Sequence, residues 1–425
     1  MMRRLACLWL GLTFGCSCTA KSAAPERAKV ECLAAVRGSD AAETSLQAAQ
    51  RAAAGAKQAD ATAWVRVGQA WLRLARVRSQ PGHYLAAENC AERALTRDAQ
   101  DVSALRLLGL LHMNAHRFAA ARALSQSLIA RNASDSLSWG TLSDAELELG
   151  HNAEATAAAQ QMVDQKPSLL SYGRAAHLRW LSGDRPGAKR LYQAAIAAGR
   201  AQSDPEPRAW MTVQAAWVFW HEGDYAGAQR GFELALSQLP DYAPALEGLG
   251  RTALSRADYR AAIAWLLRAQ KLHPLAETAW SLGDAYTLAG EHALATVSYR
   301  QVEELAARTD PRTLALFYAL QNREPRTALR LAKLAWTERQ DNYTKDVLAF
   351  VLYRNGELAE AARLAREVVA AAVPDARLTY RAGVILRAAG AAAEGGELVA
   401  RALALNPRFD ALVTGAAHGD TTAQL

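Results

Sequence analysis

The chain has 425 residues, of which 51% are hydrophobic and 21% charged, so it can bury a large core and is not a disordered tail. Its net charge of +7 comes from 49 basic and 42 acidic residues that are interspersed along the sequence. No basic stripe of the kind that nucleic-acid binding requires is formed, so we expect no nucleic-acid partner.

The N-terminus carries the pattern of an export signal. Arg3 and Arg4 precede an apolar run over residues 5–14, and Gly15 and Cys16 follow it. The end of this segment resembles a bacterial lipoprotein signal, in which a small residue precedes a cysteine that is acylated after cleavage. We therefore predict a signal peptide over residues 1–15, a lipid on Cys16 and a location in the bacterial cell envelope.

Two other ways of processing this segment remain open. The acylated residue is Cys18 in one of them, and ordinary cleavage follows Ala20 in the other. No later segment offers about 18 uninterrupted apolar residues, so we expect the membrane to be reached through the lipid rather than by a spanning helix.

Two cysteines remain in the body of the chain, Cys32 and Cys90. They can form a disulfide in an oxidising compartment. The plainer interpretation, two buried small hydrophobic side chains, is favoured because no sequence pattern brings them together.

The segments that follow the signal form a series of repeats. Residues 16–39 are predicted to be a tether, and residues 40–57 an N-terminal capping helix. Three later stretches then share one template: LRLLGLLHMNAHRFAAARALSQSLIARNA, WGTLSDAELELGHNAEATAAAQQMVDQKP and LEGLGRTALSRADYRAAIAWLLRAQKLHP. Counted from a unit start three residues before each quoted stretch, the template has small residues at positions 8, 20 and 27, larger apolar residues at 4, 7, 11 and 24, and a turn residue at 15, and all three stretches match it at positions 4, 7, 8 and 20.

These positions resemble the tetratricopeptide repeat, a helix-turn-helix unit. The resemblance implies an all-α fold, an α-solenoid of about nine to ten repeats in a right-handed superhelix over residues 58–410, with a C-terminal tail over 411–425. Units are expected to begin near Ala61, Val102, Ser136, Leu169, Ala209, Ala243, Ala276, Thr309, Asn342 and Ala376. The first unit needs about seven extra residues between Arg76 and Gly82, and the unit near Thr309 has Asn322 where a glycine turn is expected.

One predicted helix, AWMTVQAAWVFWHEGDYAGA from Ala209, has two apolar faces where an amphipathic helix has one. Its consensus core positions hold Thr212, Ala215, Ala216 and Phe219, and these leave three tryptophans and a histidine on the other face. The resemblance implies that such first-helix positions line a concave groove where ligands bind. In the alternative, the preceding insertion covers these rings, or a tightly wound superhelix buries them in its interior.

The predicted partner-binding residues are the rings at these inner positions across several units. They are Trp210, Trp217, Trp220, His221, His177, Trp180, Trp280, Tyr343, Phe350, Tyr353 and Tyr380. Clustered Trp and Tyr side chains are typical of interaction surfaces, because each joins a large apolar area to a polar group. The Lys and Asn residues that related domains use to clamp a partner's terminal carboxylate are absent at the corresponding positions, so an apolar or extended peptide segment is the expected ligand.

No motif of an enzyme is present. The chain has no Gly-x-Ser-x-Gly, no His-Glu-x-x-His and no P-loop, and it offers neither a metal site nor a cofactor site. We therefore expect an exported, lipid-anchored scaffold or assembly factor that binds a protein partner through an aromatic concave face. The competing hypothesis is a carbohydrate-binding or enzyme-regulating module of the envelope, because Trp faces also stack on sugar rings.

Overall fold

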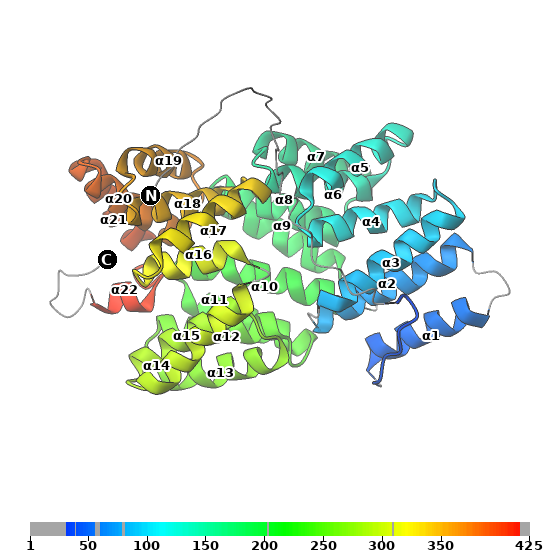
Figure 1. Cartoon of the computed structure of the whole chain (residues 1–425), viewed down its shortest axis with the longest axis horizontal. Coiled ribbons are helices and arrows are strands. Elements are labelled where there is room, and N and C mark those ends of the chain that lie inside the picture. The colour runs from blue at the N-terminus through cyan, green and yellow to red at the C-terminus, as the bar shows by residue number, and fades with distance from the viewer. Residues whose placement is uncertain are drawn as a thin grey trace, which may run out of the picture.

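The computed structural model describes residues 31–38, 40–55, 60–78, 81–201, 204–307 and 310–416. Within these ranges the chain forms 22 helices and no strand (Figure 1). The predicted signal peptide, Cys16 and part of the predicted tether and tail lie outside them. The all-α prediction is confirmed.

Ten helix pairs follow the first helix, α1 (Ala41–Gly55), and each pair is one repeat. The pairs of the first half are α2 (Ala61–Arg78) with α3 (Pro81–Arg97), α4 (Val102–Asn114) with α5 (Phe118–Arg131), α6 (Ser136–Glu148) with α7 (Asn152–Gln165), α8 (Leu169–Leu181) with α9 (Arg185–Ala198), and α10 (Glu206–His221) with α11 (Tyr225–Gln238). Those of the second half are α12 (Ala243–Ser255) with α13 (Tyr259–Leu272), α14 (Ala276–Leu288) with α15 (His292–Ala306), α16 (Pro311–Leu320) with α17 (Pro325–Glu338), α18 (Asn342–Arg354) with α19 (Leu358–Ala370), and α20 (Ala376–Ala388) with α21 (Ala392–Leu405). A short helix, α22 (Ala411–Ala416), ends the described chain.

The repeat template works because small residues let the two helices of a pair approach closely. In the pair α12/α13, a Cβ added to Gly250 would lie 2.5 Å from Cγ of Leu266. Leu266 and Ala262 are fully buried, and Ala269 is nearly so. A larger side chain at Gly250 would therefore push the two helices apart.

The first repeat differs from the others between Arg76 and Gly82, where the sequence predicts extra residues. Its extra residues lengthen α2 to 18 residues, against 13 in α4 and α6. In the later pair α16/α17, Asn322 takes the left-handed conformation that glycine takes elsewhere, with φ 51°. Both irregularities are absorbed without breaking the helix-turn-helix order.

A disulfide joins the segment before α1 to the first repeat. Cys32 and Cys90 are bonded, with their Cα atoms 5.1 Å apart, and both are fully buried. The indole N–H of Trp71 donates to the carbonyl oxygen of Cys32 at 2.7 Å and holds this segment against α2. The interpretation favoured from the sequence, two free buried thiols, is wrong, because the pairing depends on a fold in which residues 58 apart come together.

The superhelix winds so tightly that successive turns of it touch. Val368 of α19 and Leu378 of α20 belong to the same buried cluster as Trp180 of α8 and Val218 of α10. The backbone N–H of Gln340 donates to the carbonyl oxygen of Glu148 at 2.8 Å, and the side-chain amide of Asn406 donates to the carbonyl oxygen of Trp220 at 2.8 Å across 186 residues. That separation corresponds to between five and six repeats per turn.

One glycine shows how close the turns are. Gly150, in the turn between α6 and α7, has a φ of 84°, and a Cβ there would lie 2.7 Å from the carbonyl oxygen of Gln340. Any other residue would be strained by its backbone conformation and would collide with the next turn of the superhelix. The consequence is a partly enclosed hollow inside the coil.

Candidate central chamber

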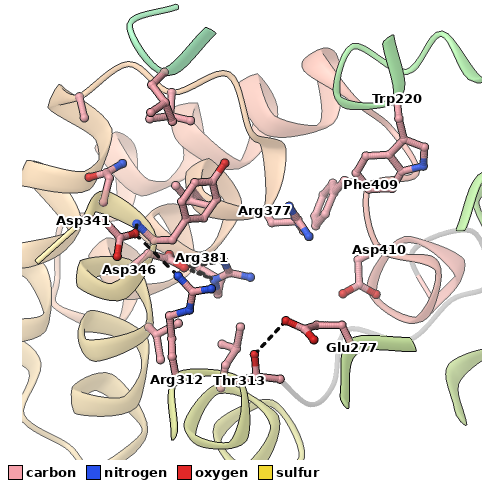
Figure 2. A pocket seen from close by; sticks show the side chains of 18 of the residues that line it. Trp220, Glu277, Arg312, Thr313, Asp341, Asp346, Arg377, Arg381, Phe409 and Asp410 are labelled. Atoms are coloured by element: carbon pink, nitrogen blue, oxygen red, sulfur yellow. Dashed lines mark hydrogen bonds and ion pairs between the residues drawn. The ribbon is translucent and has the colours of Figure 1, made fainter. Parts of the chain in front are cut away.

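The hollow of the superhelix is a cavity of about 650 Å³, which we call the central chamber. Its wall is built from the inner faces of the first helices of successive repeats, from α6 to α20, with residues of α7 and residues around the start of α22. Trp220, Glu277, Arg312, Arg377 and Phe409 lie around it (Figure 2). It lies where the sequence predicts the inner wall of the superhelix.

The chamber collects four of the predicted site residues. His177, Trp220, Trp280 and Tyr343 line it. They come from α8, α10, α14 and α18, so residues from distant repeats meet around one space. Tyr343 is enclosed, and its burial raises the pKa of its hydroxyl well above the usual value.

Two more predicted residues lie behind this wall. The ring of His221 is 5.0 Å from the ring of Trp180 and 5.2 Å from that of Trp220. Trp180 in turn stacks on His177, with 6.1 Å between the ring centres. Trp180 and His221 are buried, so they support the chamber wall from outside it.

The three tryptophans of α10 do not form one surface. Trp210 is 42% exposed on the outside. Trp217 packs edge-on against Phe232 at 5.0 Å and against Trp220 at 5.6 Å, and Trp220 is only 2% exposed. The predicted face is therefore divided between solvent, core and chamber.

The remaining predicted rings belong to the core or to the C-terminal end. Phe350 is 2% exposed and contacts Tyr353, with 5.6 Å between the ring centres. Tyr380 packs against Phe409 at 5.2 Å. Neither Phe350, Tyr353 nor Tyr380 lines the chamber.

Two arginines on α20 are held in place by buried aspartates. Arg377 donates through Nε and Nη2 to Asp375 at 3.1 and 2.7 Å. Arg381 donates through Nε and Nη2 to Asp346 at distances from 2.5 to 3.2 Å. Both aspartates are at least 98% buried. The Nη1 groups make no hydrogen bond to any described residue, and both side chains reach into the chamber (Figure 2).

A second ion network ties the chamber wall to the contact between turns. Arg339 lies 2.6 Å from Glu148 and 3.4 Å from Asp341, and Arg312 lies 3.8 Å from Asp341. Asp341 also accepts from the backbone N–H of Tyr343 at 2.9 Å at the start of α18. Burial raises the pKa of Glu148, and the charge of Arg339 opposes that rise.

The inner face of α14 carries two carboxyl groups that have no ion-pair partner among the described residues. Glu277 accepts a hydrogen bond from Thr313 at 3.3 Å, and Asp284 accepts one from Tyr299 at 2.8 Å. Burial raises the pKa of Glu277, with the carboxylate of Asp310 adding to the rise. Burial raises the pKa of Asp284 to about 8, and hydrogen bonding from Tyr299 opposes the rise.

His221 lies between the rings of the wall and the buried carboxylate of Asp375. Its Nδ1 is 3.7 Å from Asp375, longer than a hydrogen bond. Burial lowers the pKa of His221 to about 4, although the charge of Asp375 raises it, and Arg377 and Arg251 lower it further. The histidine is therefore neutral at pH 7.

The charged residues of the chamber were not predicted from the sequence. Arg377 and Glu277 each hold the second position of a unit, and Arg251 and Asp284 the ninth. The signal that would have found them is the charge that recurs at these inner positions in three different units.

Two kinds of feature are absent from the described ranges. No group of three or more His, Cys, Asp or Glu side chains is placed to hold a metal ion. None of the described helices combines the length and the apolar character needed to cross a bilayer.

Comparison with known proteins places these repeats in a family. Residues 72–136, 107–169, 213–277 and 348–408 match the model described as "Tetratricopeptide repeat", and together these ranges cover more than half of the chain. No curated protein matches the sequence.

Similar solved structures include three of different kinds. A human IFIT1 dimer with m7Gppp-AAAA shares 14% identity over 87% of this chain and 91% of its own, with a TM-score of 0.48. PilW, a type IV pilus biogenesis factor, shares 16% over 50% of this chain and 96% of its own, with a TM-score of 0.42. A thermophilic repeat protein from Thermus thermophilus, TTC0263, shares 22% over 45% of this chain and 97% of its own, with a TM-score of 0.39. At such TM-scores none of them bears on what this chain binds.

Proposed function

Because the chain belongs to the tetratricopeptide repeat family, we propose that it is a protein-interaction scaffold of the bacterial cell envelope that holds an extended segment of a partner in its central chamber. Repeat solenoids bind their partners on the concave surface that their curvature creates. In this chain the concave surface is the wall of the chamber.

The observation that carries the proposal is the contact between turns. Glu148 with Gln340 and Trp220 with Asn406 bring the turns together, so the concave face encloses about 650 Å³. Pockets of roughly 300–1,000 Å³ suit ligands of small-molecule size, and a folded domain needs far more room. An extended peptide segment fits such a space and exposes its backbone groups to the wall.

Export and lipid anchoring complete the proposal. The arginines, apolar run and Gly15-Cys16 sequence at the N-terminus support export and acylation at Cys16. The Cys32–Cys90 disulfide also supports export, because disulfides persist mainly in oxidising compartments.

A photo-crosslinking experiment tests the chamber as the binding site. Benzoylphenylalanine is placed at Leu316, which lines the chamber, and, as a matched control, at Leu294, which is 45% exposed on α15 outside the chamber. We expect irradiation of intact cells to join a protein to the chain at position 316 but not at position 294. Crosslinks at 294 alone, or at neither position, would contradict the proposal.

Two further measurements test its other parts. Fractionation of cells that produce Cys16→Ser should move the chain from the membrane to the soluble fraction, whereas Cys18→Ser should leave it on the membrane. Soluble cell-wall glycans should leave tryptophan fluorescence unchanged. A fluorescence change on adding them would favour the carbohydrate-binding hypothesis instead.

A further inference from the structure

The chamber presents carboxyl groups and guanidinium groups on separate helices around one space. Figure 2 shows Arg377 and Arg381 from α20 reaching toward the open space that Glu277 from α14 also faces. Each of the two arginines is bound by its own aspartate, whereas the carboxyl groups of Glu277 and Asp284 have no cationic partner among the described residues. The charges of Arg312 and Arg251, which also line the chamber, act on Glu277 and Asp284 respectively, but neither carboxyl group forms a direct ion pair among the described residues.

Helix α14 places these two carboxyl groups on either side of an aromatic ring. Glu277, Trp280 and Asp284 occupy neighbouring turns of one helix face, and all three line the chamber. The Trp280 ring is fixed edge-on against the buried Phe317, with 5.2 Å between the ring centres. Carboxylates beside the face of an indole ring are the groups that attract an ammonium or guanidinium ion in a desolvated site.

Hydrogen-bond donors occupy other parts of the wall. The aspartates that grip Arg377 and Arg381 leave the Nη1 groups of both turned to the chamber. These groups can donate to oxygen atoms that a ligand brings into the chamber.

We propose that the central chamber recognises an extended peptide segment through a lysine or arginine side chain, which lies between Glu277 and Asp284 against Trp280. Backbone carbonyl oxygens on either side of that residue accept from the Nη1 groups of Arg377 and Arg381. This assignment rests on the proposed function, and it adds the chemistry that selects the partner. The raised pKa of Asp284, about 8, is consistent with this assignment. A bound cation would make the carboxyl group lose its proton.

Calorimetry with defined peptide pools tests the assignment. The probes are acetylated and amidated pentapeptides with random flanking residues and a fixed central lysine, arginine, glutamate or norleucine, where norleucine keeps the aliphatic stem without the charge. We expect the lysine and arginine pools to bind at least about tenfold more tightly than the norleucine pool, as charged hydrogen bonds in an enclosed site predict. Binding of the lysine pool at pH 7 should also release protons, seen by repeating the titration in buffers with different heats of ionisation.

Matched variants locate the effect. Glu277→Gln with Asp284→Asn keeps the shapes of both side chains and removes their charge, so the lysine pool should lose about tenfold in affinity while the norleucine pool is unchanged. Glu154→Gln, on the exposed surface of α7, should change neither. Circular dichroism of both variants checks that the repeats stay folded.

Each remaining outcome has one meaning. Equal binding of the lysine and norleucine pools would overturn the cation site and leave peptide binding in place. Failure of all four pools to bind would overturn the proposed function together with the cation site. If cadaverine alone binds as tightly as the lysine pool, the cation site stands and its ligand is a small amine, so the peptide assignment is wrong.

Discussion

The contact between turns depends strongly on one side chain, Asn406, which is fully buried. Its amide nitrogen donates to the carbonyl oxygen of Trp220 at 2.8 Å, and its Oδ1 accepts from the hydroxyl of Tyr225 at 2.5 Å and from the backbone N–H of Arg408 at 3.0 Å. Two of these three bonds join residues that are more than 180 positions apart. Substituting Asn406→Ala removes all three at once.

The chain contains a matched control for this substitution. Asn132 holds the same position in its own unit, at the end of α5, with φ −150° and ψ 100° against −150° and 102° at Asn406. Its side chain also accepts from the N–H two residues later, that of Ser134, at 3.0 Å. Asn132 is exposed and makes no hydrogen bond to another turn among the described residues. The pair Asn406→Ala and Asn132→Ala therefore differs in the contact between turns and in the burial that this contact gives Asn406.

The expected difference follows from counting bonds. Each of the two bonds between turns contributes on the order of 1 kcal/mol net, and the half-buried hydroxyl of Tyr225, which loses the Asn406 oxygen, adds less than about 1 kcal/mol. The carbonyl of Trp220 keeps a bond from the N–H of Gly223 at 3.0 Å, so it adds little. We expect Asn406→Ala to lower the free energy of unfolding by about 2–3 kcal/mol more than Asn132→Ala does.

Urea denaturation and hydrogen exchange measure this difference. The urea midpoint of Asn406→Ala should fall well below that of Asn132→Ala, and amide exchange should accelerate at residues 220–225 and 405–408 only in the former. Small-angle X-ray scattering should show a larger radius of gyration for Asn406→Ala as the turns separate. Equal midpoints and equal exchange in the two variants would refute the idea that this residue holds the turns together.

Three other expected outcomes concern stability. Removing the disulfide by Cys32→Ser with Cys90→Ser should cost about 4 kcal/mol in the first repeat, as loop closure over 58 residues predicts, and the melting temperature of the variant should then no longer respond to a reductant. Because the pKa of His221 is lowered to about 4 in the fold and is near 6.5 in the unfolded chain, its contribution is full above pH 6.5 and is lost as the pH falls toward 4. His221→Gln should therefore remove up to about 3 kcal/mol of the acid sensitivity in that interval, and an unaltered stability profile against pH would contradict this. The pKa of Asp284 is raised to about 8, so its contribution is full below about pH 4 and is lost as the pH rises toward 8, and Asp284→Asn should be more stable than the wild type at pH 8 by on the order of 2 kcal/mol in urea titrations.

The repeats were predictable because their signal is local. Small residues such as Gly250 and Ala262 must recur at fixed positions for helices to approach, so nearly every helix pair begins where the template places it. The position of the turns along the superhelix depends instead on small rotations between repeats that add up over the 186 residues from Trp220 to Asn406. No short stretch records that sum, so the sequence offered a tightly wound superhelix only as an alternative to an open groove.

The winding of the superhelix also explains why the three tryptophans of α10 have different surroundings. A helical wheel places Trp210, Trp217 and Trp220 on one broad face, and this is correct for the isolated helix. In the superhelix, Trp210 is exposed to solvent, Trp217 packs against a neighbouring helix, and Trp220 lines the chamber. Replacing all three with alanine would damage the core as well as the wall, so the conservative changes on α14 are the sharper test of binding.

The contacts between turns also bear on how the chain reaches its final shape. In an open solenoid each repeat depends on its immediate neighbours, and folding can spread along the array as the chain emerges. Here Trp220 at the end of α10 accepts a hydrogen bond from Asn406, which is synthesised 186 residues later. The middle repeats should therefore reach full protection from exchange only after the last pair has formed, so a truncation before α20 would loosen helices that lie far from the cut in sequence.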